Sequence, residues 1–214
     1  MTSGQPATIG ADEICEWRLR ETAPGGPALF LDRDGVIVEE VNYLHRPEDV
    51  VVLGGAPELI ARANELGIPV VVISNQAGIG RGYYGWEDFT AVQNTIDIAI
   101  APAAIDAVLA CPFHADGKAP YDVADHPDRK PNPGMLLRAE RMLGVDLSQS
   151  WFVGDTAADV EAAARAGLAG AIHLLTGHGA KEREAVLAAG EREGFELRCV
   201  AGLPEIAGLD WLAA

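Results

Sequence analysis

Two aspartates, Asp32 and Asp34, directly follow a short apolar run in the segment Leu31-Asp32-Arg33-Asp34-Gly35. Side chains two residues apart in an extended chain point to the same side, so both carboxylates can reach one site. Gly35 then permits a sharp turn away from that site. One carboxylate can attack a phosphorus atom while the other handles the leaving-group proton. The pair therefore predicts a nucleophile, Asp32, beside a general acid and base, Asp34.

Five later residues offer groups that would complete such a site. Ser74 and Asn75 carry a hydroxyl and an amide that can donate to phosphate oxygens. Arg129 and Lys130 supply positive charge in a chain that has only three lysines. Asp155 adds a third carboxylate, and three acids at one point are tolerated when a cation such as Mg²⁺ binds them through oxygen ligands. That cation would also neutralise a bound phosphate.

Each of these short motifs also has a purely structural interpretation. Asp-x-Asp-Gly is common in turns, and Thr156 with Asp159 resembles a capping box at a helix start. Ser74 can simply end a strand, and a basic pair before a proline can be solvated. The functional interpretation is favoured because the four motifs occur together, each at the end of a predicted strand or in a loop that can reach it.

The elements that must position these residues follow from the apolar pattern. Near-continuous apolar strands that alternate with amphipathic helices are typical of a parallel sheet covered on both faces, a doubly wound α/β fold. Ligands of such folds bind beyond the carboxyl ends of the strands, where the polar residues above lie. The pattern predicts strands at 28–31, 70–73, 107–110, 151–153 and 171–175 and helices at 56–66, 86–101, 133–143 and 157–166.

The two ends of the chain give weaker signals. Residues 1–27 are predicted as an N-terminal leader with a helix near 12–20, because the breakers Pro24-Gly25-Gly26-Pro27 precede the first apolar run. Residues 28–214 are predicted as a single domain, which suits their length. Its last part should hold a helix at 181–192, a strand at 197–200 and a turn or helix at 204–212.

Composition limits the classes of function. The 214-residue chain is 49% hydrophobic, yet no apolar run approaches the roughly 18 residues of a membrane span. Its formal net charge of −16 disfavours nucleic acid and anionic lipid as partners, and leaves a small phosphorylated substrate if a cation is present. Three widely spaced cysteines and an N-terminus without a signal peptide pattern favour the cytoplasm.

The residues around these motifs resemble the haloacid dehalogenase (HAD) superfamily. The set Asp32-Arg33-Asp34-Gly35, Ser74-Asn75-Gln76, Lys130 and Gly154-Asp155 is similar to its four motifs. The resemblance implies a Rossmann-like three-layer sandwich, an aspartyl-phosphate intermediate on Asp32, and phosphate binding by Ser74 and Lys130. It also implies Mg²⁺ held by the Asp32 side chain, the Asp34 backbone carbonyl and Asp155. The short segments between the motifs leave no room for a cap domain, so a capless enzyme is expected.

Longer segments are similar to one group within that superfamily, the D-glycero-D-manno-heptose 1,7-bisphosphate 7-phosphatases, which share their pattern with histidinol-phosphatases. This resemblance implies a sugar-phosphate phosphatase, with Arg129 binding substrate beside Lys130, in a monomer or small homo-oligomer. Histidinol-phosphate hydrolysis is the alternative activity. A non-catalytic phosphate-binding protein is the alternative of another class, disfavoured because binding alone does not require Asp34. The segments are 30–35, 42–45, 75–82 and 129–135.

The chain departs from this group in two places. The group usually carries a zinc loop with Cys-x-His and Cys-x-Cys before Arg-Lys-Pro, whereas here Phe113 takes the His position. Thr156 stands where the family often has a lysine. Because the softest zinc ligands are missing, we favour a loop that folds without zinc over one that still gathers a metal. The weak zinc candidates are Cys111, His114, His126 and Asp128.

Overall fold

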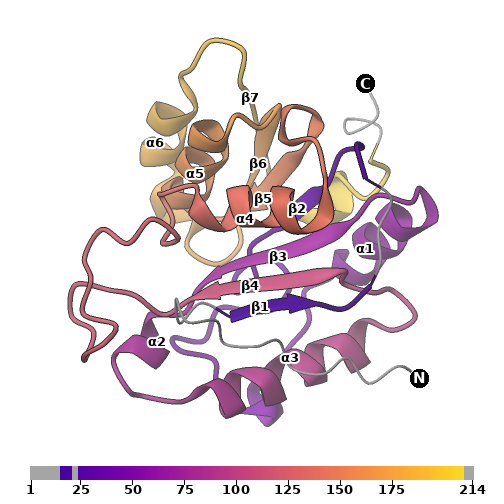
Figure 1. Ribbon diagram of the computed structural model, residues 1–214. Coiled ribbons are helices and arrows are strands. Elements are labelled where there is room, and N and C mark those ends of the chain that lie inside the picture. The colour runs from indigo at the N-terminus through magenta and orange to yellow at the C-terminus, as the bar shows by residue number, and fades with distance from the viewer. Residues whose placement is uncertain (1–14, 21–23, 210–214) are drawn as a thin grey trace.

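The computed structural model describes residues 15–20 and 24–209, which form a sheet with helices on both faces (Figure 1). Its seven strands lie in the order β1-β4-β3-β2-β5-β6-β7. All neighbouring pairs are parallel except β1 with β4, which is antiparallel. The strands are β1 Cys15–Arg18, β2 Leu29–Leu31, β3 Val70–Asn75, β4 Ala107–Cys111, β5 Trp151–Gly154, β6 Gly170–Leu174 and β7 Glu196–Val200.

The central strands form because they are short runs of β-branched and other apolar residues that are buried on both faces. Alternate side chains enter two separate hydrophobic clusters. Leu29 and Leu31 of β2 belong to one cluster, and Phe30 between them belongs to the other. The sheet is therefore the middle layer of a three-layer sandwich, as expected from the sequence.

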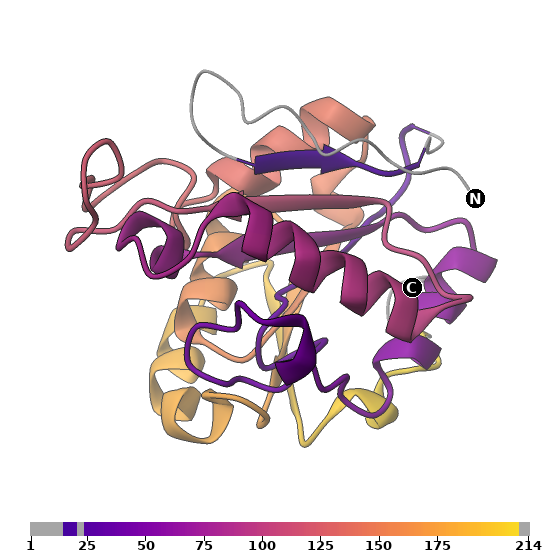
Figure 2. The same cartoon turned by 90° about the horizontal axis from the view of Figure 1, so that it is seen from below.

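The two clusters also contain the buried faces of the helices. Helices α1 (Ala56–Glu65) and α3 (Trp86–Ile100) pack on the Leu29 side. Helices α4 (Gly134–Leu143), α5 (Ala157–Ala166) and α6 (Gly179–Gly190) pack on the Phe30 side. Figure 2, seen from below, shows α3 in front of the strands and α4 beyond them.

The strand order brings the predicted site residues to one edge. Strand β2 lies between β3 and β5, with Leu31 opposite Val72 of β3 and Val153 of β5. The chain order reverses between β2 and β5, and crevices at such switch points are where ligands bind in open α/β sheets. Asp32 and Asp155, which directly follow these two strands, therefore stand on either side of the crevice.

The predicted strands and long helices are confirmed to within a few residues, and one helix prediction is wrong. Within the predicted helix at 12–20, residues 15–18 instead form β1, paired with β4, and Trp17 is buried in the core. Residues 12–14 lie outside the described range. The short helix α2 (Ala77–Gly80) was not predicted. Near the C-terminus, a 3₁₀ turn at Leu203–Glu205 lies at the start of the predicted turn or helix, and residues 210–214 are outside the described range.

Neither of the two long segments at the site edge carries an inserted cap unit in the described residues. The segment 32–55 contains a 3₁₀ turn, Pro47–Asp49, and isolated bridges at Val38. The segment 112–133 between β4 and α4 has no helix or strand and extends from the body of the molecule (Figure 1). Among the described helices, none has the length and apolar character needed to cross a membrane.

Candidate active site

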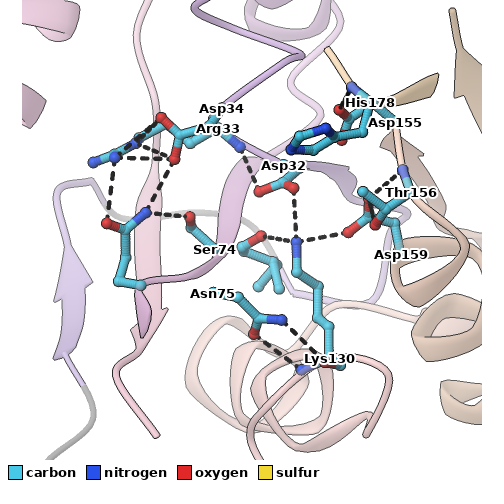
Figure 3. Close-up of polar contacts among 12 residues, drawn as sticks. Asp32, Arg33, Asp34, Ser74, Asn75, Lys130, Asp155, Thr156, Asp159 and His178 are labelled. Carbon is cyan, nitrogen blue, oxygen red and sulfur yellow. Dashed lines mark hydrogen bonds and ion pairs between the residues drawn. The ribbon is translucent and has the colours of Figure 1, made fainter. Parts of the chain in front are cut away.

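Asp32 lies at the carboxyl end of the central strand β2, beside two predicted site residues, Lys130 and Asp155 (Figure 3). One carboxylate oxygen, Oδ1, accepts the Arg33 backbone N–H at 2.7 Å, and the other, Oδ2, is 3.0 Å from Lys130 Nζ. Burial raises the pKa of Asp32 well above its ordinary value, and Lys130 opposes that shift. The carboxylate is thus fixed in orientation and depends on nearby positive charge to stay ionised.

Lys130 reaches the site from the loop before α4 and is almost completely buried. Its ammonium lies 2.6 Å from Asp159 Oδ1 and donates to the Ile73 carbonyl oxygen at 2.9 Å, in addition to the contact with Asp32. Burial disfavours the charged form, but Asp159 and Asp32 outweigh burial and raise the pKa of Lys130. Lys130 is therefore a fixed positive charge between two acids.

Three carboxylates converge beside this lysine. Within residues 15–20 and 24–209, Asp32, Asp155 and Asp159 are the one group of three or more acidic, His or Cys side chains whose ligand atoms all lie within 4.8 Å of one another. Burial and repulsion from Asp159 raise the pKa of Asp155 to about 7, although the His178 backbone N–H opposes the shift. An all-oxygen donor set with one lysine leaves excess negative charge, which fits a hard divalent cation such as Mg²⁺.

Asp159 also explains why α5 starts where it does. Its Oδ2 accepts the Thr156 backbone N–H at 3.0 Å and the Thr156 hydroxyl at 2.7 Å, which forms a capping box. Its Oδ1 faces Lys130. The structural interpretation of Thr156 and Asp159 is therefore correct, and the same carboxylate is also part of the acidic cluster.

Two glycines make space for Asp155. A Cβ atom on Gly35 would lie 2.5 Å from Asp155 Oδ2, and one on Gly177 would lie 2.2 Å from the same oxygen. Both glycines have positive φ, which disfavours any side chain there. The Thr176 hydroxyl donates to the Gly35 carbonyl at 2.6 Å and ties the two segments together.

Asp34 points away from the carboxylate cluster (Figure 3). The buried Arg33 guanidinium binds both carboxylate oxygens through Nε and Nη2 at 3.0–3.3 Å. Gln76 Nε2 donates to Asp34 Oδ2 at 3.1 Å. Arg33 itself stacks over the Phe89 ring, 4.9 Å from its centroid. Asp34 is thus next to Asp32 in the site, with its orientation set by two buried partners.

Ser74 and Asn75 end strand β3 but differ in what they contact. Ser74 Oγ is buried and accepts a hydrogen bond from Gln76 Nε2 at 2.8 Å. Asn75 exchanges two hydrogen bonds with the Lys130 backbone, donating to its carbonyl at 3.0 Å and accepting its N–H at 3.1 Å. Asn75 therefore holds the Lys130 loop against the sheet edge.

Arg129 and the weak zinc candidates lie farther along the same loop and contact other partners. Arg129 donates through Nη1 to the Phe113 carbonyl at 2.9 Å, and His126 stacks on the Phe113 ring with centroids 3.8 Å apart. In the described residues these zinc candidates are not part of any compact group of metal ligands. Burial raises the pKa of Cys111 to about 12, which favours the neutral thiol. His114 contacts Arg81, and Asp128 pairs with Arg138 at 2.9 Å.

Two adjoining cavities open beside the cluster. A cavity of about 220 Å³ is lined by Asp34, Asn75, Gln76 and Tyr84, among others. A larger one of about 670 Å³ reaches Lys181. The residues common to both linings are Glu40, Asn42 and His178. Of the predicted site residues, Asp34 and Asn75 line the smaller cavity, and neither lining includes Asp32.

The chain matches the HAD-hydrolase-like family model over residues 128–195. It is 48% identical over 148 residues to a D-glycero-beta-D-manno-heptose-1,7-bisphosphate 7-phosphatase of Mesorhizobium japonicum, an alignment that covers 68% of each chain. It is 44% identical over 144 residues to the alpha-specific counterpart from Burkholderia mallei, covering 66% of this chain and 76% of the relative.

Solved structures of phosphatases are also similar to this chain. A putative HAD-like phosphatase from Mesorhizobium loti superposes with a TM-score of 0.80 at 39% identity, covering 94% of this chain and 91% of that one. A D,D-heptose 1,7-bisphosphate phosphatase from B. bronchiseptica, complexed with magnesium and phosphate, gives a TM-score of 0.73 at 32% identity, covering 88% and 99%. With its acid cluster at the switch point of a capless α/β sandwich, the chain belongs to the HAD-like hydrolase family, among its phosphatases.

Proposed function

We propose that the protein is a Mg²⁺-dependent phosphatase that removes the 7-phosphate of D-glycero-D-manno-heptose 1,7-bisphosphate through an aspartyl-phosphate on Asp32. The observation that carries this proposal is the Asp32 carboxylate itself. It stands at the end of the central strand, 3.0 Å from Lys130 Nζ and within the cluster formed with Asp155 and Asp159. Few structural roles require three acids to converge beside one buried lysine.

In the first step, an Asp32 carboxylate oxygen attacks the phosphorus atom and the bond from phosphorus to the sugar oxygen breaks. Asp34 gives its proton to that departing oxygen, which leaves as an alcohol. Lys130 and the Ser74 hydroxyl are positioned to hold phosphate oxygens as charge develops on them. The products of this step are the sugar with a free hydroxyl group at that carbon and an acyl phosphate on Asp32.

In the second step, water attacks the phosphorus atom of the acyl phosphate. Asp34, now ionised, takes the proton from that water, and the bond between phosphorus and the Asp32 oxygen breaks. Inorganic phosphate leaves, and both carboxyl groups return to their starting states. Asp34 thus acts as an acid and then as a base, which suits its position two residues from Asp32.

The proposed metal ligands are Asp32, Asp155 and Asp159, together with the Asp34 backbone carbonyl that the family resemblance implies. Mg²⁺ bound there would neutralise the acids and the substrate phosphate. Asn75 is proposed to act on phosphate mainly through Lys130, because both ends of its amide bind the Lys130 backbone. Zinc is not part of this proposal.

The substrate is proposed from the named activities of the relatives and from the two adjoining cavities. Their linings carry hydroxyl, amide and charged groups that can bind a polyol with a second phosphate. Arg129 is kept as a substrate-binding candidate, although it lines neither cavity. A cytoplasmic location and a small phosphorylated partner, without nucleic acid or membrane, complete the proposal.

The experiment compares phosphate release by the wild type and by Asp32→Asn in the presence of Mg²⁺. We expect the amide, which is a poor nucleophile, to lower kcat by at least about 10³-fold. The matched control is Asp146→Asn, since Asp146 caps a 3₁₀ turn before β5 and an asparagine can still cap it. Full activity in Asp32→Asn would contradict the mechanism.

A substrate panel tests the narrower claim. Both anomers of the heptose bisphosphate, histidinol phosphate and simple sugar phosphates are compared by kcat/KM. We expect a heptose bisphosphate anomer to be the best substrate. A preference for histidinol phosphate would replace the substrate and keep the mechanism, whereas phosphate binding without turnover of any ester would favour the non-catalytic alternative.

A further inference from the structure

Gln76 lies behind the site, next to both Ser74 and Asp34, and its side chain is almost completely buried. Its Nε2 donates to Ser74 Oγ at 2.8 Å and to Asp34 Oδ2 at 3.1 Å. Its Oε1 accepts the Tyr84 hydroxyl at 2.6 Å and faces Arg33 Nη2 at 3.4 Å. The Gln76 amide therefore donates two hydrogen bonds through Nε2 and accepts two through Oε1.

The chemistry of these neighbours fixes which end of the amide is which. An amide turned over would direct its NH₂ group at the Arg33 guanidinium, which can only donate. It would also direct its oxygen at the Asp34 carboxylate, which can only accept when ionised. The orientation with Oε1 toward Arg33 and Tyr84 is the one that satisfies every group.

We infer that Gln76 is a positioning residue that sets the direction of the Ser74 hydroxyl and the orientation of the Asp34 carboxylate, with Tyr84 anchoring its far end. This inference rests on the proposed phosphatase function and deepens it. The Gln76 amide donates to Ser74 and Asp34, so its own two protons are not directed at a phosphate oxygen. Gln76 acts here through two neighbours that contact the substrate.

Gln76 affects the direction in which the Ser74 hydroxyl proton points. Because Ser74 Oγ accepts from Gln76, the hydroxyl proton is free to point elsewhere, toward a phosphate oxygen in the crevice. Hydrogen bonds in a chain strengthen one another, so the donor at Tyr84 makes Gln76 a better donor and Ser74 in turn a better donor. Without Gln76, the hydroxyl could turn toward Asp34 instead.

The consequence for Asp34 concerns its geometry. Arg33 binds the carboxylate from one side, and Gln76 fixes Oδ2 from another, so the group cannot rotate freely. Asp34 lines the smaller cavity, so the fixed carboxyl group borders the space where a leaving group would stand. Loss of Gln76 should therefore harm proton transfer as well as phosphate binding.

Tyr84 is suited to act as the anchor. It is about nine-tenths buried and stacks on the His45 ring at 5.5 Å between centroids. Burial is the largest cause of a raised pKa for Tyr84, with Arg33 acting in the opposite direction, so the hydroxyl keeps its proton. A protonated phenol can supply the donor that Gln76 Oε1 needs.

The first experiment measures Gln76→Leu with two substrates, the heptose bisphosphate and p-nitrophenyl phosphate. The sugar oxygen leaves poorly without a proton, whereas p-nitrophenolate leaves readily without one. We expect kcat to fall roughly ten-fold more on the sugar phosphate than on the aryl phosphate, about the worth of one hydrogen bond to a charged group. Equal losses on the two substrates would overturn the assignment to Asp34.

The second experiment is a double-mutant cycle with Ser74→Ala, read out as inhibition by inorganic phosphate. If Gln76 acts on phosphate through Ser74, Gln76→Leu weakens phosphate binding in the wild type and has little further effect in Ser74→Ala. If Gln76 binds phosphate directly, the two losses add, and the inference is wrong. Thermal unfolding of each variant confirms that only folded protein is compared.

A matched pair of variants tests the role of Tyr84 as the anchor. Tyr84→Phe removes the donor to Gln76, and Tyr83→Phe removes the neighbouring hydroxyl, which is on a 60% exposed side chain. We expect a loss of about three- to ten-fold in kcat on the sugar phosphate for Tyr84→Phe alone. An equal effect of both variants would contradict the anchor. A wild type without phosphatase activity would refute the proposed function instead, so the two failures are distinguishable.

Discussion

Asp155 combines three features in one carboxyl group: burial, a neighbouring acid and two glycines whose lack of side chains lets it lie close to their backbone. Burial and Asp159 disfavour its ionised form, so a proton would compete with the proposed metal ion for the same oxygens. The single backbone hydrogen bond from His178 only partly offsets them. The charge state of this one residue therefore links metal binding to pH.

The expected outcome is that stabilisation by Mg²⁺ grows as pH rises through about 7, the value to which the pKa of Asp155 is raised. In the metal-free protein, the folded state keeps this proton at pH values where the unfolded chain has already lost it. The contribution of Asp155 to metal-free stability therefore decreases as pH rises from its ordinary pKa of about 4 toward 7. Bound Mg²⁺ removes that cost by pairing with the ionised form.

This is measured as the difference in Tm between samples with saturating Mg²⁺ and with EDTA, from about pH 5.5 to 8.5. Asp155→Asn serves as the comparison, since an amide does not titrate in this range. A Tm difference that is independent of pH in the wild type, or that shrinks as pH rises, would contradict the prediction.

Residue by residue, the sequence indicated the carboxylates that follow strands better than it indicated their partners. Asp32 and Asp155 were recognisable because each directly follows an apolar run. Asp159 was interpreted only as a helix cap, although an acid four residues after Asp155 on the first turn of a helix can face the same point. Gln76 is part of the sequence motif Ser74-Asn75-Gln76, but its role depends on Tyr84 and Arg33 folding around it, which the motif does not reveal.

At the scale of elements, strand β1 and the loop 112–133 are where sequence patterns and structure differ most. Cys15, Trp17 and Leu19 alternate with charged residues, a period-two pattern that favours a strand, but four residues are too few to outweigh a helical interpretation. The parallel strands were predictable because their apolar runs are continuous. The edge strand is antiparallel and was placed by its pairing with β4, which no local pattern reveals.

The loop 112–133 uses side-chain contacts where the related group usually has a zinc site. Phe113 stacks on His126 and forms an edge contact with Tyr121, while Arg138 pairs with Asp128. The stack of Phe113 on His126 joins the two segments that hold the weak zinc candidates. Arg129 donates to the Phe113 carbonyl, so the stack of Phe113 on His126 also helps to position this candidate substrate-binding residue.

We therefore expect the loop to be independent of zinc. Protein dialysed against a zinc-selective chelator should keep its Mg²⁺-supported activity and its resistance to limited proteolysis in the loop. Elemental analysis should find well below one zinc per chain. The comparison variant combines Phe113→His, His126→Cys and Asp128→Cys, which supplies the missing ligand types and should acquire zinc. Stoichiometric zinc in the wild type, lost together with activity on chelation, would refute this expectation.

The whole molecule carries a net charge of −16 and yet is proposed to bind an anion. A charge this far from zero destabilises the compact state through self-repulsion and repels anionic ligands at long range. The positive charge at the site is local, concentrated on Lys130 and on the proposed cation. The long-range electrostatic field therefore disfavours both substrate binding and folding, and salt screens both effects.

We expect NaCl to stabilise the metal-free protein. Between about 10 and 150 mM the Debye length falls from roughly 30 to 8 Å, which weakens repulsion across the surface. For a chain of this size each kcal/mol of added stability raises Tm by about 2–4 °C, so an increase of a few degrees is expected. Differential scanning calorimetry in EDTA measures it, with sucrose at matched osmolality as the control. A decrease in Tm with NaCl would show that attractive ion pairs dominate instead.

The reciprocal pair between the Asn75 amide and the Lys130 backbone has a consequence for how the protein folds. It joins segments 55 residues apart, and the bond from Thr176 to Gly35 spans 141 residues. Contacts of such long sequence separation form slowly, because closing the intervening loop costs conformational entropy. Asp155 and Asp159 are four residues apart, but Asp32 joins them only through contacts of long sequence separation. During folding, the ability to bind a metal ion should appear only with the completed sheet edge, so an unfinished chain would not hold its cation.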